Sequence, residues 1–194
     1  MPPDDIRHRL PDRLFHWGMA ILVITLLGTA FLPIMGLKFD WVPVHWISGV
    51  LLTLAILFHL YRALVIHGIR QMLPTGADLR SIMGNDPASE EQKYDLNQKI
   101  YHWSVSSLIL ILVVTGAIML AKIDTPLWNR DPSILSDGNW GLVYLFHGAG
   151  SLFLIFFFIL HIYFAFLPEH RQLLVAMVFG KRKNNAEDKT GNPT

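Results

Sequence analysis

Apolar and polar positions follow each other along this chain in long blocks. Four blocks contain no Asp, Glu, Lys or Arg, and each is at least 21 residues long. A helix of about 20 apolar residues crosses the roughly 30 Å of hydrocarbon in a bilayer, and a spanning helix satisfies its own backbone hydrogen bonds. The pattern therefore predicts four membrane-spanning helices, over residues 14–37, 41–61, 100–121 and 141–168.

The polar blocks predict connections and tails. Pro33 and Pro43 indicate a short connection after the first span, and the Asp137-Gly138 pair indicates a turn before the last one. Pro168 should break or kink the chain after the last span, because the residue before a proline disfavours helical backbone. The apolar stretch 171–179 follows, with basic residues around it, and predicts a short interfacial helix. The expected organisation is a tail (1–13), a four-helix transmembrane domain (14–168) and a C-terminal segment (169–194).

Composition agrees with an all-α membrane protein. Hydrophobic residues make up 52% of the 194, charged residues 16%, and the mean hydropathy is +0.38. The first span is too long for a secretion signal and lacks a small-residue cleavage site, so it should remain in the mature chain. The net charge of +1 gives no reason to expect a nucleic-acid partner.

The basic residues predict the orientation in the membrane. Thirteen of the sixteen Lys and Arg residues lie in the two tails or between residues 62 and 99, whereas Lys38, Lys122 and Arg130 lie on the opposite side. The excess of basic residues marks the cytoplasmic side of a membrane. We therefore expect a multi-pass protein of the bacterial inner membrane, surrounded by lipid, with both termini in the cytoplasm.

The absence of cysteine limits the chemistry. The chain has no Cys, which excludes disulfides, iron–sulfur clusters bound by its own thiolates and haem attached through C-x-x-C-H. Any haem that it holds is non-covalent and therefore of the b type.

Histidines recur at one spacing in two of the apolar blocks. His147 and His161 are 14 residues apart, and so are His45 and His59. In a helix this spacing is about 21 Å along the axis and about 40° short of four turns, so both rings leave the same face. Ionisable residues inside a membrane are costly and are functional candidates. Histidines that face each other at two depths predict two stacked haems.

At the outer depth the topology places only His45 and His147, which predicts one bis-histidine iron site. The alternative is that both are neutral side chains hydrogen-bonded to neighbouring helices. Gly49, Gly148 and Gly150 lie close to them in sequence. Glycines there would leave room for a flat macrocycle, or would let helices pack closely.

At the inner depth there are more candidates than one site needs. His161 can pair with His16, His59 or His102, and spacing alone favours His59, because it repeats the geometry of His45. The residues alone leave this choice open. Three basic residues near this depth could pair with haem propionates or extend to the headgroups: Arg13, Arg62 and Lys99.

Two short motifs resemble a known family. Arg13-Leu-Phe-His16-Trp17 resembles an R-x-x-H-W signature, and the stretch 93–99, KYDLNQK, resembles K-Y-N-x-G-Q-K. With the spacing of His147 and His161, they resemble the cytochrome b (gamma) subunit of membrane-bound formate dehydrogenases. That subunit belongs to a wider family of four-helix di-haem b cytochromes, which includes the hydrogenase b-type subunit. The resemblance extends from about residue 10 to residue 183.

The resemblance implies a ligand set for each haem. It assigns the outer haem to His45 and His147, and the inner haem to His16 and His161. The R-x-x-H-W match contains the ligand itself, so the resemblance replaces the preference for His59 that spacing gave.

The resemblance also implies a menaquinone site, formed by Asp95, Asn97, Gln98 and His161. Asp95 stands where the pattern has Asn, and Asn97 stands where it has Gly. Asp95 could donate a proton to reduced quinone, or could cap the following helix.

The function implied is electron transfer by one subunit of a complex. An iron–sulfur (beta) subunit and a catalytic molybdenum or tungsten (alpha) subunit would deliver electrons to this chain, which would pass them inward through two b-type haems to menaquinone. On its own the chain would not act on formate. The alternatives are a subunit of a hydrogenase or another periplasmic oxidoreductase, a stand-alone quinol-oxidising cytochrome b, a transporter with a histidine proton relay, and a passive anchor.

Overall fold

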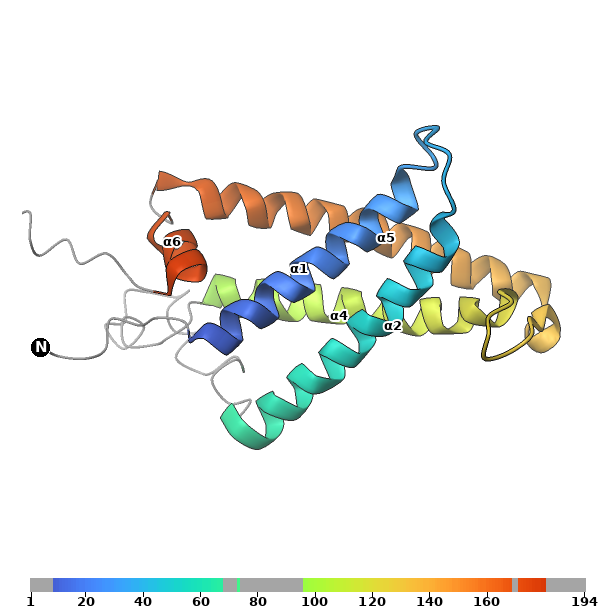
Figure 1. The fold of residues 1–194 in the computed structure, drawn as a ribbon, viewed down its shortest axis with the longest axis horizontal. Coiled ribbons are helices and arrows are strands. Elements are labelled where there is room, and N and C mark those ends of the chain that lie inside the picture. Colours follow the sequence, from blue (N-terminus) through green and yellow to red (C-terminus); the bar gives the residue numbers. More distant parts are fainter. Residues whose placement is uncertain (1–8, 68–72, 74–95, 169–170, 181–194) are drawn as a thin grey trace, which may run out of the picture.

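Helices form the regular structure of the computed structural model, which describes residues 9–67, 73, 96–168 and 171–180 (Figure 1). Four of these helices are long and apolar enough to cross a membrane. They are α1 (Leu10–Phe31), α2 (Trp41–Tyr61), α4 (Leu96–Met119) and α5 (Asp137–Phe166). The shorter elements are the π-helical turn η1 (Arg62–His67), the 3-10 turns η4 (Leu120–Lys122) and η5 (Pro132–Ile134), and α6 (Arg171–Phe179). The prediction of an all-α membrane protein with four spans is confirmed.

One spanning helix matches its predicted span at both ends, and the ends of the other three differ from the prediction by two to six residues. α2 coincides with the uncharged stretch between Asp40 and Arg62. α1 begins earlier than its uncharged stretch, because Pro11 lies in its first turn, where a proline removes no helical hydrogen bond. α5 ends at Phe166, and the next residue, Leu167, is extended with ψ 139°, as expected before Pro168.

Two residue groups expected in connections lie inside helices. Pro43 belongs to the first turn of α2, where the backbone N–H groups have no intrahelical acceptor and a missing donor costs little. The Asp137-Gly138 pair forms the start of α5, and the carboxylate of Asp137 there opposes the positive end of the helix dipole. Both groups start helices, so the turn prediction was wrong at these positions.

The four spanning helices form two antiparallel hairpins, α1–α2 and α4–α5. Contacts within each hairpin are more extensive than contacts between them. Figure 1 shows the first hairpin crossing the second obliquely, with the start of α1, the start of α4 and α6 at one end of the molecule. The loops that close the two hairpins lie toward the other end.

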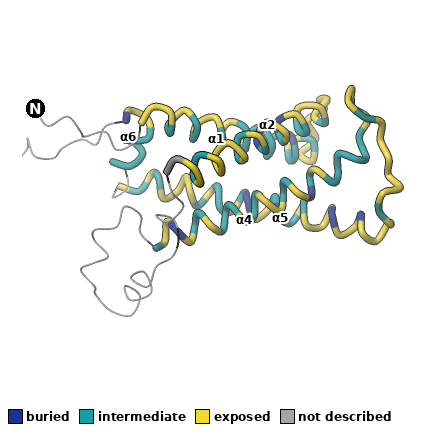
Figure 2. Tube along the Cα trace, turned by 90° about the horizontal axis from the view of Figure 1, so that it is seen from below, coloured by how far each residue is buried: buried dark blue, intermediate teal, exposed yellow. Residues whose placement is uncertain are grey.

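Few described side chains are fully buried, and Figure 2 shows them scattered along the tube. Leu52 and Leu154 are 5% and 8% exposed, whereas Ile21 is 63% and Phe153 is 61% exposed. Large apolar side chains exposed on each spanning helix suit a surface that faces lipid. The outer surface of the bundle is thus apolar, as expected for a surface in contact with lipid.

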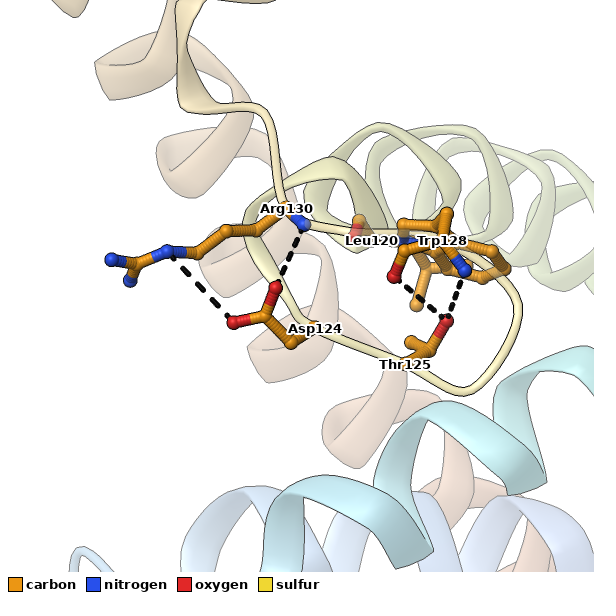
Figure 3. A network of polar contacts seen from close by, with 5 residues as sticks. All are labelled: Leu120, Asp124, Thr125, Trp128 and Arg130. Atoms are coloured by element: carbon orange, nitrogen blue, oxygen red, sulfur yellow. Dashed lines mark hydrogen bonds and ion pairs between the residues drawn. The ribbon is translucent and has the colours of Figure 1, made fainter.

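The loop between α4 and α5 is held by its own polar contacts (Figure 3). The carboxylate of Asp124 accepts from the backbone N–H of Arg130 at 2.9 Å, and the hydroxyl of Thr125 accepts from the N–H of Trp128 at 3.2 Å. The indole N–H of Trp128 donates to a carbonyl of η4 at 3.1 Å. The Trp128 ring also lies 6.3 Å from the ring of Trp46 on α2. The loop is therefore attached to both hairpins.

α6 is attached to the start of α1. The guanidinium of Arg13 donates to the carbonyl of Met177 at 3.2 Å and to that of Val178, and the indole N–H of Trp17 donates to Met177 at 3.4 Å. α6 ends at Gly180, whose φ of +84° and bond to a carbonyl one turn earlier form a left-handed cap. Two residues of the R-x-x-H-W motif thus hold the C-terminal helix.

Candidate functional site

His45 on α2 and His147 on α5 face each other across the two hairpins. Their ring centres are 6.3 Å apart and their planes are 70° apart. Both side chains are half-buried. The sequence placed these two histidines at one depth, and the structure brings their rings together.

His16 on α1 and His161 on α5 form a second facing pair. Their ring centres are 6.1 Å apart and their planes are 43° apart. α5 thus supplies one histidine to each pair, from positions 14 residues apart. The ring of Tyr101 on α4 stacks on His161, with centres 5.8 Å apart and planes 22° apart, and its hydroxyl donates to the carbonyl of Phe157 at 2.9 Å.

The other two candidates for the inner level, His59 and His102, lie against aromatic rings. His59 stacks on Phe15, with ring centres 5.2 Å apart. His102 meets Trp103 edge-on, with centres 6.2 Å apart. It is therefore His16, the candidate that the family resemblance chose, that lies opposite His161.

Both facing pairs fit a bis-histidine haem. A metal about 2 Å from one nitrogen of each imidazole, with that nitrogen about 1 Å from its ring centre, separates the two ring centres by roughly 6 Å. Among the residues that the structure describes, no three His, Cys, Asp or Glu side chains converge as they would around a bare metal ion. Paired imidazoles suit a haem, because its porphyrin supplies the remaining four ligands.

Two threonines that the sequence reasoning missed contact the first pair. The hydroxyl oxygen of Thr29 lies 2.8 Å from Nδ1 of His45, and that of Thr115 lies 2.9 Å from Nδ1 of His147. Thr29 lies on α1 and Thr115 on α4, so each bond stays within one hairpin. A polar residue at the same depth as a candidate ligand was the one available signal in the sequence.

Glycines near the histidines have different roles. A Cβ on Gly116 would lie 3.3 Å from Cε1 of His147, so this glycine, which sequence reasoning missed, leaves room for the ring. A Cβ on Gly150 would lie 3.1 Å from Leu112, which indicates close packing of α4 on α5. A Cβ on Gly148 would meet nothing within 4 Å, and one on Gly49 would make only an ordinary contact.

The three basic residues considered for propionates are buried or half-buried. Arg62 pairs with Asp12 at 2.6 Å, which joins the end of α2 to the start of α1. Arg13 donates to the carbonyls of α6. Lys99 is 3% exposed.

The candidate quinone residues lie partly outside the described chain. Asp95 is outside it, whereas Asn97 and Gln98 are exposed in the first turn of α4. Tyr101 follows Asn97 by about one helical turn and stacks on His161. The start of α4 is therefore close to His161.

Comparison with known proteins shows the family of this chain. The family described as prokaryotic cytochrome b561 matches residues 7–180. A formate dehydrogenase cytochrome b556 subunit of Haemophilus influenzae is 28% identical over 186 residues, covering 83% of this chain and 70% of that protein. A nitrate-inducible formate dehydrogenase cytochrome b556 subunit of Escherichia coli is 23% identical over 181 residues, covering 83% and 77%. The chain therefore belongs to the prokaryotic cytochrome b561 family and is a membrane cytochrome b.

Proposed function

We propose that this chain is the membrane-anchoring, di-haem cytochrome b subunit of a formate dehydrogenase, and that it delivers electrons to a quinone, with menaquinone the expected acceptor. One observation carries the proposal: two histidine pairs, with ring centres 6.3 and 6.1 Å apart, join the helical hairpins at two levels. The names of the relatives in Haemophilus influenzae and Escherichia coli support the choice of formate dehydrogenase.

Each histidine pair holds one haem b in this proposal. His45 and His147 would hold one, and His16 and His161 would hold the other. When bound, haem b would supply one-electron transfer. His147 and His161 lie about 21 Å apart along α5, so one helix sets the spacing of both sites.

The quinone site is assigned to Asp95, Asn97, Gln98 and His161. The contact of Tyr101 with His161 supports this assignment, because it brings the start of α4 next to the second histidine pair. Asn97 and Gln98 offer amide groups that can hydrogen-bond a quinone carbonyl. Asp95 would supply a proton to the reduced quinone.

The basic residues support the orientation. Thirteen of sixteen lie in the tails or between residues 62 and 99, which favours the cytoplasmic side of the inner membrane for tail 1–13 and segment 169–194. The transmembrane domain 14–168 then has His45 and His147 toward the periplasm. There an iron–sulfur (beta) subunit, attached to a molybdenum or tungsten (alpha) subunit, would meet it.

Purification in mild detergent from native membranes tests the proposal. Two haem b per chain, together with iron–sulfur and formate-oxidising subunits, are expected. His147→Ala should halve the haem content per polypeptide, and an unchanged content would refute the ligand assignment. Co-purification with a hydrogenase, or with no partner, would favour another member of the same family. A colourless protein would favour a proton-relay transporter.

A further inference from the structure

The threonines beside the first histidine pair have hydrogen-bond geometry that constrains the imidazoles. Oγ1 of Thr29 lies 2.7 Å from the carbonyl oxygen of Thr25, 3.0 Å from that of Leu26 and 2.8 Å from Nδ1 of His45. A hydroxyl has one hydrogen to donate, and carbonyl oxygens only accept. The hydroxyl of Thr29 therefore donates to its own helix and accepts from an N–H at Nδ1 of His45.

Thr115 repeats this arrangement in the other hairpin. Its Oγ1 lies 2.7 Å from the carbonyl oxygen of Ile111, 3.2 Å from that of Leu112 and 2.9 Å from Nδ1 of His147. Thr29 is 5% exposed and Thr115 is 8% exposed, so water does not compete for either hydroxyl. Nδ1 of His147 is thus also the nitrogen that carries the hydrogen.

The opposite tautomer is disfavoured at both positions. If the hydroxyl donated to Nδ1, its lone pairs would face a carbonyl oxygen 2.7 Å away in each helix. In surroundings of low dielectric such an unpaired contact is costly. In the neutral imidazole, a hydrogen on Nδ1 leaves the lone pair on Nε2 available to a metal.

We propose that Thr29 and Thr115 are positioning residues that fix the ring orientation and the tautomer of His45 and His147. The inference rests on the proposed function, in which these two histidines bind a haem. The second hydrogen bond of a metal-bound imidazole orients the ring and raises its basicity. Each threonine acts within its own hairpin. Each imidazole can therefore be oriented within one hairpin, without the other.

The chain offers matched variants. Valine has the shape of threonine without the hydroxyl, and serine keeps the hydroxyl. Among the described threonines, Thr25 makes the same bond to a carbonyl one turn earlier, at 2.8 Å, and its hydroxyl has no hydrogen bond to a histidine. Thr29→Val and Thr115→Val are therefore compared with Thr29→Ser and Thr115→Ser, and with Thr25→Val.

Three properties of the holoprotein in detergent are measured. The first is the rate at which haem is lost to a haem-scavenging apoprotein, and the second is the midpoint potential of each haem. The third is the low-spin ferric EPR signal, which depends on the angle between the imidazole planes. Each valine variant should lose one haem about 10- to 100-fold faster. The potential of that haem should rise, because a less basic imidazole stabilises ferric iron less. The other haem should be unchanged, serine should restore the signal, and Thr25→Val should behave as the unmodified chain.

Failure of this inference differs from failure of the proposed function. If His147→Ala removes one haem while both valine variants keep the retention, potentials and EPR signals of the unmodified chain, the ligand assignment stands and the role of the threonines is refuted. Loss of both haems in a valine variant, without recovery in the serine variant, would also refute it, because it would indicate a general packing defect. If His147→Ala leaves both haems in place, the proposed function itself fails.

Discussion

Phe15 and His59 stack within the first hairpin, with ring centres 5.2 Å apart and planes 14° apart. The residue next to Phe15 is His16, which faces His161 of the second hairpin. Two consecutive positions of α1 therefore have different tasks. One joins α1 to α2, and the other reaches across the bundle.

This arrangement predicts the effect of replacing His59. In His59→Phe an aromatic ring remains available to Phe15, but no nitrogen can bind iron. The haem content per polypeptide, measured on the purified protein, should equal that of the unmodified chain. His16→Phe is the matched control and should lose one of the two haems. The reverse result, with one haem lost from His59→Phe alone, would move the ligand to α2.

Gly116→Ala should weaken haem binding at the first pair. The new Cβ would lie 3.3 Å from Cε1 of His147, so the ring must shift by a few tenths of an ångström. Overpacking of this kind typically costs about 1–3 kcal/mol, which should appear as faster haem loss from that site. Folding stability is the wrong measure here, because alanine favours the helix by up to about 1 kcal/mol. Gly141→Ala, at another glycine of α5 where a Cβ meets nothing within 4 Å, should leave haem retention unchanged, and equal effects of the two variants would contradict this explanation.

Arg13→Ala should release α6 from α1. The guanidinium donates to the carbonyls of Met177 and Val178, and hydrogen bonds of charged donors contribute about 1.5–3 kcal/mol. Because the chain has no cysteine, Ala176→Cys introduces a single thiol at a position that is 0% exposed. Maleimide labelling of that thiol should become several-fold faster when Arg13 is replaced.

The control for the α6 experiment is Arg9→Ala, which removes the same charge from the residue before α1. Labelling at position 176 should then stay slow. If both arginine variants label equally fast, loss of positive charge would explain the result better than loss of the two hydrogen bonds.

Asp131, in the loop between α4 and α5, should titrate below its ordinary range. The hydroxyl of Ser133 and then its backbone N–H donate to this carboxylate, which lowers the pKa of Asp131 from the usual 3.8. Because the folded-state pKa is lowered, these bonds stabilise the loop above pH 3.8, and their contribution is lost as the pH falls through the lowered value. The carboxyl-carbon NMR shift of Asp131 measures this titration. Ser133→Ala should return the midpoint toward 3.8, and an unchanged midpoint would show that Ser133 is not the cause.

The spans could be predicted from the sequence because the cost of placing a charge in hydrocarbon dominates their positions. α2 extends over the residues between Asp40 and Arg62 for this reason. The sequence also predicts that His45 and His147 lie at the same depth. Both helices run between the same two membrane surfaces, so residues at equal depth can meet. Pro43 and Asp137 were placed wrongly, because the first turn of a helix accepts residues that otherwise signal a turn.

The inner pair could not be chosen from spacing. Spacing favours His59, provided that α2 stays beside α5 along its whole length. In Figure 1 the first hairpin crosses the second obliquely, and at the second level it is His16 of α1 that faces His161. The angle at which two hairpins cross depends on packing over many residues. The spacing of two histidines in the sequence gives no information about that angle.

Thr29, Thr115 and Gly116 were missed for a related reason. Thr29 precedes His45 by 16 residues, whereas Thr115 precedes His147 by 32, because the second connection is longer. The two hairpins therefore contain the same threonine–histidine hydrogen bond, although the two residues are separated by different distances in the sequence. Which threonine faces a histidine depends on the rotation of each helix about its axis.

The meeting of the two hairpins has a consequence for biogenesis. Each hairpin packs more against itself than against the other, and both histidine pairs run between them. Insertion can therefore proceed hairpin by hairpin, as independently stable helices do before they associate. If each histidine pair holds a haem, as proposed, haem would join the two hairpins, and its supply would then limit the maturation of this chain. In a haem-starved cell, membrane proteases would encounter an inserted but unclosed precursor.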